Sequence, residues 1–196
     1  MRQTPTAIAL AATLALTGCI SFGAKPPPSL LMLTAQATMG AGQSRTAGAG
    51  EAVTIITPTT PAALATNRVP VQADDTNIAY IDKAQWVDVP AKMFQQLVSE
   101  TVAAKTGRVV LDARQFSFDP GVRVTGELSR FGLDARAMEA VVTYDAAKSG
   151  VNGTRVEERR FEARVPVSAI EAGPAGAALN QAANQVAAEV AAWIGG

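Results

Sequence analysis

Apolar residues recur at helical spacing in the segment that opens with Asp88-Val89-Pro90. Positions three and four residues apart fall on one face of an α-helix. Proline is tolerated in the first turn of a helix, and glycine favours the position just beyond its end. The pattern therefore predicts an amphipathic helix that starts near Pro90 and ends before Gly107. Its apolar stripe consists of Phe94, Leu97, Val98, Thr101 and Val102.

A second apolar stripe lies near the C-terminus, between Ala175 and Ile194. A helix that lies on a membrane surface usually carries lysine and arginine on its polar face, and this segment has neither. We therefore expect the second helix to pack on a sheet. Its stripe consists of Leu179, Ala183, Val186, Val190, Trp193 and Ile194.

Shorter runs rich in β-branched residues predict strands. The loop at 148–153 is typical of a hairpin, so the later runs predict an antiparallel meander. Together with the two helices, this order predicts an α+β fold, a two-layer sandwich whose mainly antiparallel sheet carries two amphipathic helices. The predicted strands are 52–57, 68–72 and 77–81 before the first helix, and 108–111, 122–131, 138–144 and 156–167 after it.

The first residues have the layout of an export signal. Arg2 precedes an apolar stretch at 7–16 that is too short to span a bilayer. The sequence Leu16-Thr17-Gly18-Cys19 then resembles a bacterial lipobox, which implies cleavage before Cys19 and attachment of diacylglycerol and an N-acyl chain to it. Ile20, rather than aspartate, favours the periplasmic face of the outer membrane. The alternative is an ordinary signal peptide with an incidental cysteine.

These features divide the chain into a lipoprotein signal peptide at 1–18, an acylated N-terminus with a flexible tether at 19–50, and a folded domain at 51–196. Within the tether, three consecutive prolines at 26–28 favour an extended spacer. We expect the apolar run at 29–33 to dock on the domain as an edge strand, and the Gly-rich stretch from Gly40 to be mobile.

Composition excludes several classes of site. The chain has 196 residues, no histidine, one cysteine and 17 residues of each charge sign. These counts exclude histidine-based catalysis, imidazole metal sites and internal disulfides, and the neutral balance argues against nucleic acid. Asp134 and Glu139 could face a common site, but turns and strands commonly carry such acids. We therefore expect a non-enzyme without catalytic residues, metal or cofactor.

Several short motifs occur together. Tyr80 is followed by Trp86 and by Pro90 at a helix start, Arg159-Arg160-Phe161 lies in a predicted strand, and an Ala-rich helix at 177–194 closes the chain. In this order they resemble the ABC-type transport auxiliary lipoproteins (PqiC/YmbA-like), over about 52–194. The segment 61–68 departs from the family pattern, because it lacks the usual aromatic residue and the aspartate before the arginine.

The resemblance implies a component of an MCE-type lipid transport system, in which an inner-membrane ABC transporter works with an MCE-domain protein that crosses the periplasm. The auxiliary lipoprotein would form a homo-oligomer and dock the far end of that conduit at the outer membrane. Arg68, Tyr80 and Trp86 are expected at a partner surface or pocket. The alternatives are a periplasmic phospholipid carrier and a purely structural envelope lipoprotein.

Overall fold

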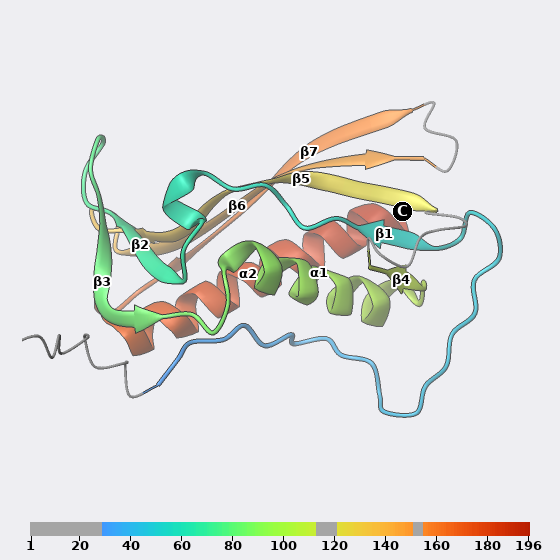
Figure 1. Ribbon diagram of the computed structural model, residues 1–196, viewed down its shortest axis with the longest axis horizontal. Helices are drawn as coiled ribbons and strands as arrows, with labels where there is room; N and C mark the ends of the chain where they lie inside the picture. The colour runs from blue at the N-terminus through green and yellow to red at the C-terminus, as the bar shows by residue number, and fades with distance from the viewer. Residues whose placement is uncertain (1–28, 113–120, 151–154) are drawn as a thin grey trace, which may run out of the picture.

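The computed structural model describes residues 29–112, 121–150 and 155–196. These residues form a seven-stranded sheet with two helices on one of its faces (Figure 1). The α+β class and the expected order of strands and helices are confirmed. The elements are β1 (Val53–Ile55), a short 3-10 helix η2 (Ala62–Leu64), β2 (Arg68–Gln72), β3 (Ile78–Gln85), α1 (Pro90–Thr106), β4 (Val110–Leu111), β5 (Val122–Asp134), β6 (Glu139–Ser149), β7 (Val156–Pro166) and α2 (Ala172–Gly195).

The sheet is built around β5. One edge of β5 pairs with β6 along almost its whole length, and β6 pairs with β7, both antiparallel, so the predicted meander is confirmed. The other edge pairs in parallel with β1 near the start of β5 and with β2 near its end. β3 extends the sheet antiparallel to β2, and β4 extends it parallel to β1. The sheet is therefore mixed, although its long pairings are antiparallel.

Each helix forms where its apolar stripe predicts. In α1 the whole predicted stripe is buried, and Gly107 ends the helix in the left-handed conformation with φ 74°. α2 begins three residues before Ala175 and presents a buried face rich in alanine. Small side chains let helices approach closely, which fits the direct packing of α2 on α1.

Three aromatic pairs lie in the core. Trp86, just after β3, packs on Phe131 of β5 with ring centroids 5.4 Å apart. The other pairs join a helix to the sheet at 5.2 and 5.5 Å: Phe94 of α1 with Tyr144 of β6, and Trp193 of α2 with Phe161 of β7. The last two pairs are edge-to-face, and such contacts add to the stabilisation from apolar burial.

The N-terminal strap, residues 30–45, runs beneath the helices on the side away from the sheet (Figure 1). The Leu31 N–H donates to the Gln85 carbonyl at 2.7 Å, so the apolar run docks beside β3 through one bridge. Farther along, Asn180 and Asn184 of α2 bind the strap backbone. The Arg45 guanidinium donates to the Ala103 carbonyl of α1. This part of the predicted tether is thus in contact with the domain, while the predicted boundaries at 19 and 51 remain predictions.

Candidate functional site

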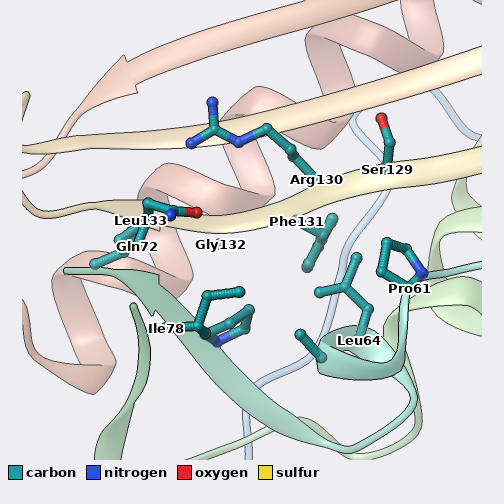
Figure 2. A pocket seen from close by; sticks show the side chains of 11 residues that line it. Pro61, Leu64, Gln72, Ile78, Ser129, Arg130, Phe131, Gly132 and Leu133 are labelled. Carbon is teal, nitrogen blue, oxygen red and sulfur yellow. The ribbon is translucent and has the colours of Figure 1, made fainter. Parts of the chain in front are cut away.

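A small pocket lies beside the open part of the β5 edge. Among the described residues, β1 pairs with β5 as far as Val124, one bridge joins Thr59 to Glu127, and β2 pairs from Leu133 onward. Between these contacts, residues 129–131 pair with no described strand on this edge of β5. The pocket fills this gap, with η2, β2 and β3 facing β5 across it (Figure 2).

The lining of the pocket is mostly apolar. Leu64, Phe131 and Leu133 are almost completely buried, whereas Ile78 is 51% exposed, so an apolar floor opens to solvent past Ile78. The volume is about 180 Å³. Pockets for drug-sized ligands measure roughly 300–1,000 Å³, so this one suits a single apolar side chain or a group of similar size. The lining residues are Pro61, Ala63, Leu64, Pro70, Gln72, Ile78, Ser129, Arg130, Phe131, Gly132 and Leu133.

Two irregularities of the backbone shape the pocket. The register between β5 and β6 shifts between Leu128 and Arg130, which marks a β-bulge at Ser129. On the facing side, the β2–β3 register shifts between Arg68 and Pro70, as expected for a proline within a strand. β2 approaches β5 closely at Gly132, where an added Cβ would lie 2.5 Å from the Pro70 carbonyl oxygen. Glycine is therefore required at this point of contact.

Two of the predicted site residues come together behind η2. The Arg68 guanidinium lies over the Tyr80 ring, with its Cζ 4.2 Å from the ring centroid. The Tyr80 hydroxyl donates to the Ala63 carbonyl of η2 at 3.2 Å. Since Ala63 and Leu64 line the pocket, Tyr80 supports its wall without lining it, and Arg68 in turn covers the Tyr80 ring.

The third predicted residue, Trp86, is completely buried. Its ring packs behind Phe131, and its Nε1 has no hydrogen-bond partner in the described part of the chain. Trp86 therefore acts as packing beneath the pocket floor. The predicted residues surround the pocket, whereas none of the three lines it.

Polar side chains near the pocket are engaged with one another on the outer face of the sheet. Arg130 extends away from Leu64 and Ile78 (Figure 2) and lies 3.7 Å from the Asp134 carboxylate. The Ser129 hydroxyl donates to Asp145 at 2.9 Å, and Arg160 binds the same carboxylate at 2.5 Å. Arg160 is the main reason that the pKa of Asp145 lies below its usual value, and Ser129 lowers it further. This carboxylate is held ionised.

Asp134 and Glu139 are register partners at the β5–β6 turn. The Asp134 carboxylate accepts the N–H groups of Ala137 and Arg136, and these bonds lower its pKa. Glu139 faces Arg164 at 3.4 Å. Both acids thus have structural partners. Within residues 29–112, 121–150 and 155–196, no group of three acidic or sulfur side chains is arranged to hold a metal.

The remaining predicted site residue, Cys19, lies outside the described residues. Sequence reasoning missed the pocket lining on β5, although a signal was present. Apolar positions fall on even numbers up to Leu128 and on odd numbers from Phe131, and such a change of parity within one strand indicates a bulge.

Comparison with protein families gives a match over residues 33–191, to the family described as the ABC-type transport auxiliary lipoprotein component. The chain belongs to this family. The match begins inside the N-terminal strap, so the family pattern of these auxiliary lipoproteins includes most of the strap. None of the described helices of this auxiliary lipoprotein is both long and apolar enough to cross a membrane.

Two solved structures share the fold of this auxiliary lipoprotein. Protein XCC0632 from Xanthomonas campestris, of the family DUF330, is 19% identical, with a TM-score of 0.67 over 85% of this chain and 94% of that one. An uncharacterized protein is 14% identical, with a TM-score of 0.65 over 77% of this chain and 96% of that one. No curated protein sequence matches this auxiliary lipoprotein.

Proposed function

We propose that this auxiliary lipoprotein is a non-enzymatic component of an MCE-type lipid transport system, anchored through acylated Cys19 to the periplasmic face of the outer membrane. There it docks the far end of the conduit formed by the MCE-domain protein, as a homo-oligomer. The observation that carries the proposal is the family match over 33–191. A domain tethered to a membrane is kept at high effective concentration near that surface, which suits a docking role.

The pocket at the β5 edge is our candidate for the docking contact. It offers an apolar floor of the size of one side chain, beside a stretch of strand edge with one strand neighbour. An extended segment of a partner can use such an edge for backbone hydrogen bonds and place one apolar side chain in the pocket. The wall at η2 lies in the segment 61–68 that departs from the family pattern, so we expect the partner segment to differ accordingly.

The phospholipid carrier is the weaker alternative for this pocket. A carrier must shield acyl chains from water, and a volume of about 180 Å³ is small even for a drug-sized ligand. The helices also pack directly on the sheet and on each other, with the facing side chains buried.

Native mass spectrometry of the acylated protein, extracted gently from membranes together with the MCE-domain protein, tests the proposal. We expect acyl chains on Cys19 and an oligomer that carries the MCE-domain protein without bound phospholipid. One phospholipid on each chain would favour the carrier. A monomer that carries acyl chains but never the partner would favour the structural role, and a chain without acyl groups would overturn the anchor.

A charge at the pocket rim should block docking. Ile78→Glu places a carboxylate at the mouth of the apolar floor, where a partner's apolar side chain would have to desolvate it. We expect partner affinity to fall at least tenfold while the free energy of unfolding stays within about 0.5 kcal/mol, because Ile78 is exposed.

Val156→Glu is the matched control, because Val156 is 60% exposed and lies at the start of β7, away from the pocket. Binding can be measured by biolayer interferometry with the immobilised MCE-domain protein. If the two variants bind equally well, the pocket is not the docking contact.

A further inference from the structure

Three exposed apolar side chains gather where the N-terminal strap meets the end of β3. Large hydrophobic side chains of a folded domain are mostly buried, and contiguous exposed ones mark a surface that contacts something else. Leu30 is 50% exposed, Met32 is 62% exposed and Val87 is 54% exposed. These three residues are called the apolar tip below.

Backbone pairing brings the apolar tip together. Leu31 pairs with Trp86 in a parallel bridge, with the Val87 N–H donating to the Leu31 carbonyl at 2.9 Å. Side chains alternate between the two sides of an extended segment. Leu31 and Trp86 point inward, and Leu31 lies against Gly176 of α2. The residues on either side of them, Leu30, Met32 and Val87, therefore point outward together.

The apolar tip continues into a shallow groove between the strap and α1. The groove has a volume of about 270 Å³ and contains both Met32 and Val87, with Met93 and Leu97 beneath them. Asp88, next to Val87, is paired with Lys92 at 3.4 Å. Glu100 lines the far part of the groove, where its carboxylate accepts the Met39 N–H at 2.9 Å. The three side chains of the tip itself are apolar, so apolar burial is the main attraction that the tip offers.

The position of the tip along the chain indicates what covers it. Cys19 precedes Leu30 by 11 residues, and a chain of this length reaches at most about 40 Å when fully extended. Under the proposed anchoring of Cys19, the tip is held within that distance of a bilayer. Apolar side chains on a surface kept at a bilayer enter the boundary between headgroups and acyl chains.

We infer that the apolar tip is a membrane-contacting surface, which rests on the lipid-anchored function proposed above. Leu30, Met32 and Val87 insert into the boundary between headgroups and acyl chains of the periplasmic leaflet, the leaflet that holds Cys19, and this contact orients the domain. The end that carries the strap start and the end of β3 then faces the bilayer. The end of β6 and the start of β7, at the opposite end of the molecule, face away from it (Figure 1).

Spin labels can measure this orientation in the acylated full chain. Cys19 is the only cysteine, and acylation blocks its thiol, so one new cysteine accepts one nitroxide. The variants are Met32→Cys and Val87→Cys, with Val156→Cys at the far end as the matched control. Each is bound to vesicles of phosphatidylcholine, and the collision rates of the label with oxygen and with a water-soluble nickel chelate report its depth.

We expect labels at positions 32 and 87 to collide at least threefold more with oxygen than with the nickel chelate, relative to the label at position 156. Vesicle-bound protein whose labels at 32 and 87 match the control would overturn the inference and leave the anchor intact. Labels shielded from both reagents would also overturn it, because a protein would then cover the tip. Protein that does not float with vesicles, and whose unsubstituted chain accepts the label at Cys19, would overturn the anchor itself.

Discussion

The Tyr80 hydroxyl links β3 to η2, because it donates a hydrogen bond to the Ala63 carbonyl. Tyr80→Phe removes this bond while keeping the ring under Arg68. We expect the free energy of unfolding to fall by about 0.5–1.5 kcal/mol, and amide hydrogen exchange in η2 to become faster.

Tyr144, the second tyrosine of the chain, provides the control. Its hydroxyl likewise donates to one backbone carbonyl, that of Thr125, and burial raises its pKa. Tyr144→Phe should destabilise the fold without changing exchange in η2. If the amides of η2 keep their protection from hydrogen exchange in Tyr80→Phe, the Tyr80 hydroxyl does not support the pocket wall.

Gly132 sets how closely β2 can approach β5. Gly132→Ala brings a Cβ against the Pro70 carbonyl, which cannot move as a flexible side chain would. We expect the free energy of unfolding, measured by urea denaturation, to fall by about 1–3 kcal/mol. Gly173→Ala at the start of α2, where nothing lies within 4 Å of the added Cβ, should be neutral or stabilising. Equal stability of the two variants would contradict this account of the pocket.

Among the elements, the helices were predictable because each follows from residues close in sequence. The stripe from Phe94 to Val102 and the stop at Gly107 fix α1 with no knowledge of the rest of the chain. The parallel pairings of β5 with β1 and β2 were not predictable, because they join segments that lie far apart in sequence. The same limit applies to the pocket, which exists only where those two pairings leave a gap.

The contacts that residues 34–45 of the strap make with the helices were not predictable, for a related reason. A segment without periodicity that contains glycines and small residues indicates a linker, and its composition carries no sign of the partners that hold it. Those partners are side chains on the helices, namely Asn180, Asn184 and Glu100. In the final helix, Asn184 occupies a buried position that an aliphatic residue would otherwise fill. A polar residue at a buried position of an apolar stripe was the available signal.

Asn184 should hold the middle of the strap. It accepts the Gln36 N–H at 2.8 Å and donates to the Thr34 carbonyl at 2.9 Å. Asn184→Ala removes both hydrogen bonds. We therefore expect the free energy of unfolding to fall by about 1–3 kcal/mol and the Gln36 amide to lose its protection from hydrogen exchange. Asn180→Ala, which removes one bond to the Thr34 N–H, should affect Thr34 and leave Gln36 protected. Unchanged protection at Gln36 in Asn184→Ala would show that the strap is held by other contacts.

On the scale of the whole molecule, charged residues on the outer face of the sheet form a connected network. Arg164 binds both Glu162 and Glu139, and Arg160 binds Asp145. Isolated surface ion pairs contribute little, but a network with hydrogen bonds contributes more. The Thr143 hydroxyl donates to Glu162 at 2.8 Å and is the first cause of the lowered pKa of that carboxyl, followed by Arg164.

This network predicts how stability depends on pH. The pKa values of Asp145 and Glu162 are lower in the folded chain than in the unfolded one, so the unfolded chain binds more protons in acid. Their contribution is present above the unfolded pKa values, near 4, and is lost as the pH falls through the folded values. We expect urea midpoints that are flat from about pH 6 to 8, since the chain has no histidine, and that fall below about pH 5.

Asp145→Asn should lower the free energy of unfolding at pH 7 and make it fall less steeply as the pH drops below about 5. Equilibrium urea unfolding of both chains at pH 7, 5 and 3 measures the effect. If the free energy of unfolding changes with pH by the same amount in the variant and the parent chain, this carboxylate does not contribute to the pH dependence of stability.

The strap also has a mechanical consequence. When Cys19 is fixed in a bilayer and a partner pulls on the domain, tension enters the fold at the start of the strap and loads the Leu31 bridge first. Bonds arranged one after another along a peeling segment yield in sequence at low force. Residues 30–45, once released and fully extended, would span at most about 55 Å. Under the docking role proposed above, the strap would serve as a reserve of length that takes up changes in the spacing between membrane and conduit before the sheet is loaded.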